Sequence, residues 1–184
     1  MSKSIEQQAE ICAGLAKIRP QPINASPLKE ISYDKIISAL EQFMECVRYL
    51  NTRRSTGAKL NLEGEDDVQD AIFLMLRPWI TDLVYENPTD KTGNRFVIKD
   101  FLAKTAETVI EAKFIRDESH GKYISKELHD DIETYRHHPQ CKHLIFFIYD
   151  PDSLIPDAAA LHTEITTTRT YDGKPLHCHL IIRP

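Results

Sequence analysis

The chain has 184 residues, of which 41% are hydrophobic and 28% charged, a composition that argues against a disordered chain and fits one compact domain with an added helical element. Its formal net charge of −5 gives no global attraction to nucleic acid, although a local basic face would be enough to bind phosphates. The four cysteines form no CxxC pair, and no stretch has the pattern of a signal peptide or a membrane span, so we expect a cytoplasmic protein with no membrane association.

The first third of the chain is expected to be helical. Residues 4–18 have the pattern of a short amphipathic helix, and the three prolines of segment 19–27 end it. A second helix is expected from about Ser32 to about Arg53. Its apolar residues recur at helical spacing and form a stripe: Ile36, Ile37, Leu40, Phe43, Met44, Val47 and Leu50. Such a stripe needs a partner, either the next domain or a second copy of the chain. We therefore expect residues 1–57 to serve dimerisation or partner docking.

Residues 58–184 are expected to form the main domain. A third helix is predicted from Glu65 to about Val84, with an irregularity at Pro78. Further elements follow in chain order: strands over 97–103 and 107–115, a helix over about 125–135, and strands over 143–150 and 176–183. The predicted fold class is therefore α/β, with a mixed sheet flanked by helices and an N-terminal helical extension.

The first two strands contain three charged residues among apolar neighbours: Asp100, Glu111 and Lys113. If the hairpin turn consists of residues 105 and 106, Asp100 lies directly opposite Glu111. Opposed residues of an antiparallel pair place their side chains on one face, with Cβ atoms about 5 Å apart. Lys113 lies on that same face because side chains alternate with a period of two. For a turn of this length, the three charges converge at one edge of the sheet.

Two carboxylates at this separation repel each other unless a cation neutralises them. Mg²⁺ does so with hard oxygen ligands while keeping several waters, and a neighbouring lysine can orient or deprotonate a water or stabilise developing negative charge. The alternative interpretation is that the charges belong to a solvated outer face of the sheet. The short D-x(10)-E-x-K pattern alone leaves both interpretations open.

Longer motifs in the same region carry a family resemblance. The segment GEDDVQDAIFLMLRPWITD at 64–82 is similar to an opening helix with an acidic residue and a D-V-Q-D signature. VIEAKFIRD at 109–117 resembles an I-E-V-K-x-x-R core, and the run at 127–151 resembles a helix, a Y-x-x-H-P turn and an F-V-Y-D-P strand end. LIIRP at 180–184 fits the C-terminus. In this order, the motifs resemble those of the PD-(D/E)XK nuclease superfamily, in particular its DpnII/MboI-type restriction endonuclease domain.

The resemblance implies a role for each matching residue. Asp100 and Glu111 would bind Mg²⁺, which Mn²⁺ can replace, and the Ala112 carbonyl would be a further metal ligand. Lys113 would serve the attacking water or the transition state. Glu65 would be an additional acid that helps to hold metal or water.

Other residues of this region are candidates for binding nucleic acid. Gln69 lies one helical turn from Glu65. Arg116, Lys122 and Lys126 are candidates for a phosphate-binding track beyond the active edge. Acidic residues are interleaved with these cations, so a solvated helix face is an equal alternative.

Two departures from the family pattern affect these expectations. Extra residues separate Arg95 from Asp100, where the family has a compact R-x-D-F segment. Glu127 occupies a position where the family often has glutamine, and an acid there is unfavourable beside a phosphate.

Together these features predict a metal-dependent endonuclease that hydrolyses DNA phosphodiester bonds through a Mg²⁺-bound water, in a restriction or anti-phage setting. A homodimer is expected because cutting both strands of a duplex needs two active sites, and a defence-system partner protein is a further candidate. Two alternatives stay open: a nuclease-like subunit that binds nucleic acid or assembles a complex without cutting, and the same chemistry on RNA.

Overall fold

The computed structural model describes residues 31–53, 59–88 and 98–184 of the chain. The helix expected over 4–18 lies outside these residues. The helices are α2 (Tyr33–Glu41), α3 (Phe43–Thr52), α4 (Glu65–Leu76), α5 (Glu118–Tyr135) and α6 (Ala158–Ile165). The strands are β1 (Leu83–Pro88), β2 (Ile98–Ala103), β3 (Thr108–Phe114), β4 (His143–Tyr149), β5 (Thr168–Tyr171) and β6 (Lys174–Arg183). Among the described residues, no helix is both long and apolar enough to span a membrane.

The strands form one mixed sheet in the order β1-β2-β3-β4-β6-β5. The β1/β2, β2/β3 and β5/β6 pairs are antiparallel, whereas β3/β4 and β4/β6 are parallel. The central strand β4 is buried along its five inner residues, Leu144 to Ile148, as its unbroken apolar run predicts. This arrangement confirms the expected mixed sheet flanked by helices.

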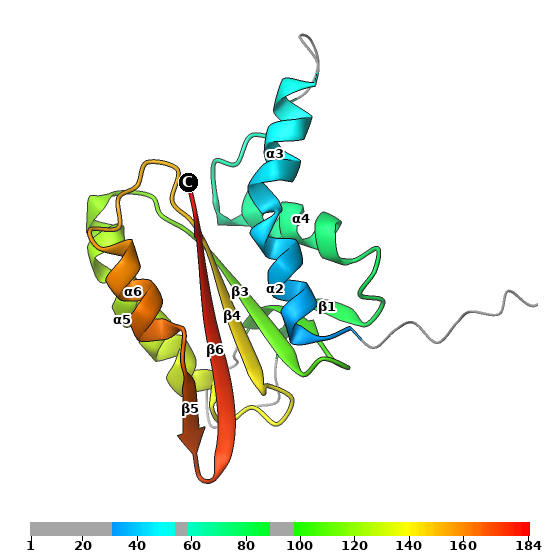
Figure 1. Cartoon of the computed structure of the whole chain (residues 1–184), viewed down its shortest axis with the longest axis vertical. Coiled ribbons are helices and arrows are strands. Elements are labelled where there is room, and N and C mark those ends of the chain that lie inside the picture. The colour runs from blue at the N-terminus through cyan, green and yellow to red at the C-terminus, as the bar shows by residue number, and fades with distance from the viewer. Residues whose placement is uncertain (1–30, 54–58, 89–97) are drawn as a thin grey trace, which may run out of the picture. The chain divides into compact units, whose positions relative to one another are not determined.

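Two hydrophobic cores hold the helices against opposite faces of the sheet (Figure 1). On one face, α2, α3 and α4 pack on side chains that include Ile110, Ala112 and Phe147. On the other face, α5 and α6 pack on Val109, Phe146 and Leu180, among others. Because side chains alternate along β3 and β4, each of these two strands contributes residues to both cores.

Most of the apolar stripe of segment 32–53 packs on the sheet of the same chain. Ile36, Leu40 and Phe43 have no exposed surface, and the Phe43 ring lies 4.6 Å from that of Phe147, centroid to centroid. Residues 31–184 form one compact unit, so the expected boundary between residues 57 and 58 does not coincide with a division in the structure. The buried part of the stripe therefore has its partner within the chain, whereas Leu50 at its end is 47% exposed, and a role of this segment in dimerisation or docking stays a prediction.

Several other elements differ from expectation. The helix over 32–53 is interrupted at Gln42, which joins α2 to α3. The helix expected from Glu65 to Val84 ends at Leu76 because Pro78 has no N–H to donate, and the chain then enters β1. The structure adds β1, α6 and β5, which sequence reasoning missed. Asp172 and Gly173, both with positive φ, make the tight β5/β6 turn that an Asp-Gly pair favours.

Candidate active site

The β2/β3 hairpin has the predicted register. The Glu107 N–H donates to the Lys104 carbonyl across 3.1 Å, so the turn consists of residues 105 and 106. The paired residues are Phe101 with Ile110, Leu102 with Val109, and Ala103 with Thr108. Continuing this register by one residue sets Asp100 opposite Glu111. The predicted two-residue turn and register are therefore confirmed for the paired residues, and the opposition of Asp100 and Glu111 extends them by one residue.

Asp100 lies just beyond the last β2/β3 pair and binds the neighbouring strand through its side chain. Its Oδ2 atom accepts a hydrogen bond from the Ala112 N–H at 2.7 Å. Burial raises the pKa of Asp100 to about 6, although this N–H bond and the Lys113 ammonium act in the opposite direction. The hydrogen bond holds the carboxylate in a defined position, and a bound cation would offset the free energy that burial of its charge costs.

Glu111 is buried, with 4% of its surface exposed. The Tyr135 hydroxyl of α5 donates a hydrogen bond to its Oε1 atom. Burial, and next the charge of Asp100, raise the pKa of Glu111 well above its usual value, and the Tyr135 bond opposes this rise. The charge of Asp100 therefore disfavours the ionised form of Glu111, a condition that a bound divalent cation would relieve.

Lys113 is held by an acid on α5. Its Nζ atom lies 3.3 Å from Oδ2 of Asp131. Burial alone would lower the pKa of Lys113, but Asp131, Glu111 and Glu65 together raise the pKa above its usual value. The side chain is therefore a cation at neutral pH, and it adds positive charge to a cluster of carboxylates.

A cavity of about 430 Å³ opens beside Lys113. Glu65, the first residue of α4, and Arg116, which follows β3, line it together with Lys113. His120 and Glu127 of α5 also line it, with the His120 Nε2 atom 3.4 Å from the Glu127 Oε2 atom. The unfavourable acid at position 127 thus has a histidine partner. The cavity therefore combines the carboxylates of Glu65 and Glu127 with the cationic side chains of Lys113 and Arg116.

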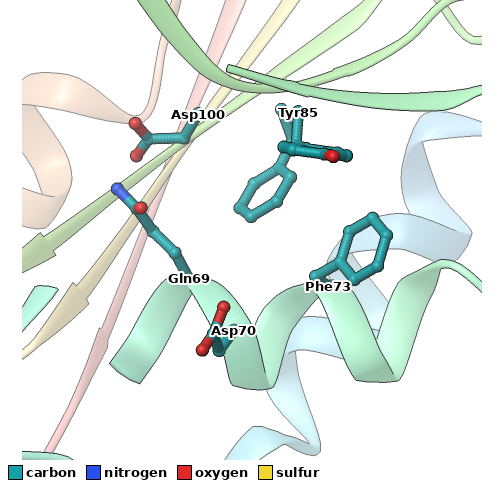
Figure 2. Close-up of a pocket in the computed structure, with 6 residues that line it drawn as sticks. Gln69, Asp70, Phe73, Tyr85 and Asp100 are labelled. Atoms are coloured by element: carbon teal, nitrogen blue, oxygen red, sulfur yellow. The ribbon is translucent and has the colours of Figure 1, made fainter. Parts of the chain in front are cut away.

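The structure separates the four expected nucleic-acid contacts into two groups. Gln69 hydrogen-bonds the Asp100 side chain from α4, and Figure 2 shows its amide turned toward that carboxylate. Arg116 shares the cavity with Lys113. Lys122 and Lys126 are exposed on α5 and do not line this cavity, and Lys122 lies 3.7 Å from Glu118 in an ion pair. The interpretation as a solvated helix face fits these two lysines better.

The donor set fits a hard divalent cation. Asp100, Glu111 and Glu65 supply carboxylate oxygens, which Mg²⁺ prefers, and Mg²⁺ often needs only one or two protein carboxylates because it retains waters. In the described parts of the chain, no three His, Cys, Asp or Glu side chains are already gathered around a common point. The ligand roles of these residues and of the Ala112 carbonyl stay predictions.

Sequence reasoning missed two residues that contact the candidate site, Asp131 and Tyr135. Both lie on α5 and contact the charged groups of β3 directly. A signal was available, since they share the helical spacing of the buried residues Leu128 and Ile132. An acid and a tyrosine on the buried face of a helix need polar partners, and β3 supplies both.

A comparison with protein families agrees with this geometry. The family model for DpnII-MboI restriction endonucleases matches residues 34–179, well over half of the chain. The match includes α2 and α3, which agrees with their packing on the sheet. No curated protein and no solved structure matches the chain. The family implies a nuclease that acts on DNA. The chain belongs to the DpnII/MboI restriction endonuclease family.

Proposed function

We propose that this protein is a Mg²⁺-dependent endonuclease that hydrolyses phosphodiester bonds in DNA, with Mn²⁺ able to substitute. The observation that carries the proposal is the juxtaposition of Asp100, Glu111 and Lys113 on one hairpin, with Lys113 lining a cavity. When bound, the metal would neutralise the carboxylates and lower the pKa of an attacking water. A restriction or anti-phage role, with or without a partner protein, is part of the proposal and follows from the family.

The acidic and the basic residues of the site have different proposed roles. Asp100 and Glu111, with Glu65 and the Ala112 carbonyl, would hold the ion. The raised pKa of Lys113 supports a role as a cation that stabilises negative charge developing on the phosphate, and argues against proton abstraction by this residue. Arg116 would contact a phosphate from the same cavity.

Cutting both strands of a duplex needs two active sites, so we propose that the enzyme acts as a homodimer. Because Ile36, Leu40, Phe43 and Val47 of the apolar stripe are buried, the contact would use other, exposed residues. Sedimentation of the protein with and without a DNA duplex would measure the number of copies. A single copy bound to a duplex that is cut in both strands would contradict this part of the proposal.

A plasmid-cleavage assay tests the main proposal. The wild type should convert supercoiled plasmid to nicked and linear forms with Mg²⁺ or Mn²⁺ and not in EDTA. Lys113→Ala should lower the rate by about 10²-fold or more, the loss that follows removal of one charge-stabilising group. Lys104→Ala is the matched control, since Lys104 is an exposed lysine of the same hairpin. Cleavage that persists in Lys113→Ala contradicts the proposed site.

The same assay on a labelled RNA of matched sequence separates the two possible substrates. The carboxylates and Lys113 would act on the phosphodiester and not on the sugar, so discrimination must come from contacts outside this cluster. Faster cleavage of RNA than of DNA would assign the chemistry to RNA. Binding of DNA without any cleavage would favour the non-catalytic alternative.

A further inference from the structure

A second cavity lies beside Asp100, between α4 and the first two strands. It has a volume of about 260 Å³ and is lined by Gln69, Asp70, Phe73, Tyr85, Asp100 and Phe101 (Figure 2). None of the roles proposed above for metal binding or charge stabilisation uses its three aromatic residues. We call this cavity the aromatic pocket.

The walls of the aromatic pocket are three rings from three different elements. The Phe73 ring of α4 lies 5.5 Å from the Tyr85 ring of β1, edge to face, and 6.5 Å from the Phe101 ring of β2 in a nearly parallel orientation. Phe101 is buried in the core, whereas Tyr85 is 61% exposed. A large ring that stays in water at the mouth of a pocket offers its surface to a ligand. The shape and chemistry suit a flat, apolar-faced group.

The polar groups of the aromatic pocket exclude an anion. Asp70 and Asp100 contribute carboxylates and Gln69 an amide, and among the residues that the structure describes no cationic side chain lines the pocket. A phosphate would be repelled here, while a neutral ring with N–H donors would be attracted. Nucleobases that carry an exocyclic amino group have both a flat π-face and such donors.

The position of Asp100 connects the pocket to the reaction. Asp100 lines the aromatic pocket and also belongs to the cluster that would hold the ion at the scissile phosphate. A group bound in this pocket is therefore close to the bond that is cut. We infer that the aromatic pocket receives a nucleobase next to the scissile phosphate, taken out of the base stack and packed against Tyr85. This inference rests on the proposed nuclease function.

Taking a base out of a duplex costs free energy, and the cost is lower for a mismatched base. The enzyme should therefore bind a mismatched duplex more tightly than a matched one, through Tyr85. Fluorescence anisotropy measures this with two labelled DNA duplexes of one sequence, one fully paired and one with a central mismatch. Ca²⁺ replaces Mg²⁺ so that binding is observed without turnover.

The variants isolate the ring from the rest of the pocket. Tyr85→Ala should weaken binding of the mismatched duplex by about tenfold, the usual worth of one base–aromatic stack, and bring it close to that of the paired duplex. Tyr85→Phe keeps the ring and should bind both duplexes as the wild type does. Tyr49→Ala is the matched control, because Tyr49 is a tyrosine of α3 that is 59% exposed and does not line the pocket.

The outcomes distinguish this inference from the proposed function. If Tyr85→Ala loses the preference for the mismatch while the wild type cuts no plasmid, the pocket is supported and the nuclease proposal fails. If the wild type cuts with metal and Tyr85→Ala binds both duplexes unchanged, the nuclease stands and the pocket assignment is overturned. A wild type that binds neither duplex also overturns the pocket assignment.

Discussion

Replacing Asp100 by asparagine is expected to stabilise the metal-free protein at neutral pH, although Asp100 belongs to the proposed active site. Burial raises the pKa of its carboxyl from 3.8 to about 6 in the folded state. The folded protein therefore binds this proton more tightly than the unfolded chain does. The resulting contribution to stability is complete below pH 3.8 and is lost as the pH rises through about 6. Asparagine has no such proton and keeps an oxygen that can accept the Ala112 N–H.

The shift sets the size of the effect. A rise of about 2 pKa units corresponds to about 3 kcal/mol of unfolding free energy. The difference in stability between Asp100→Asn and the wild type should grow from about 0.5 kcal/mol at pH 4 to about 3 kcal/mol at pH 8. Urea unfolding in EDTA, followed by circular dichroism at several pH values, measures this difference. Asp152→Asn, at an exposed aspartate after β4, is the control and should show no such growth.

Adding Mg²⁺ provides a second readout. Because a ligand of the folded state stabilises it by mass action, the ion should raise the unfolding free energy of the wild type more than that of Asp100→Asn. A difference between the two proteins that stays constant from pH 4 to pH 8 would refute the reasoning. A variant that is less stable than the wild type at pH 8 would refute it as well.

Three further changes test the elements around the site. Tyr135→Phe keeps the buried ring but removes the hydroxyl that binds Glu111, so plasmid cleavage should fall about 10- to 100-fold with unchanged circular dichroism; equal rates would contradict this. Asp131→Asn removes a group that raises the pKa of Lys113, so activity should decline at a lower alkaline pH in rate–pH profiles; an unmoved alkaline limb would contradict it. Gly121→Ala puts a Cβ atom 2.4 Å from the Leu154 carbonyl oxygen and should cost about 1–3 kcal/mol in thermal unfolding, whereas Gly64→Ala meets no atom within 4 Å. Equal losses of unfolding free energy in Gly121→Ala and Gly64→Ala would contradict the glycine prediction.

The sequence by itself determined the hairpin that carries the site. A two-residue turn and the period-two alternation of strands are local properties, so the convergence of Asp100, Glu111 and Lys113 could be worked out by counting. The family motifs, which follow the same local segments, supplied the roles. The buried strand β4 was predictable for a similar reason, because an apolar run of this kind needs cover on both faces.

Other features depended on how distant elements pack. The apolar stripe on α2 and α3 required a partner, but its sequence could not distinguish the sheet of the same chain from a second copy. The contacts of Tyr135 with Glu111 and of Asp131 with Lys113 join residues about 20 positions apart across the face that α5 covers. The aromatic pocket needs three elements at once. Helical and strand periodicities predict which side of an element is buried. They do not predict which element packs against that side, because this depends on the burial and charge pairing of the whole folded chain. Only the tertiary structure shows these partners.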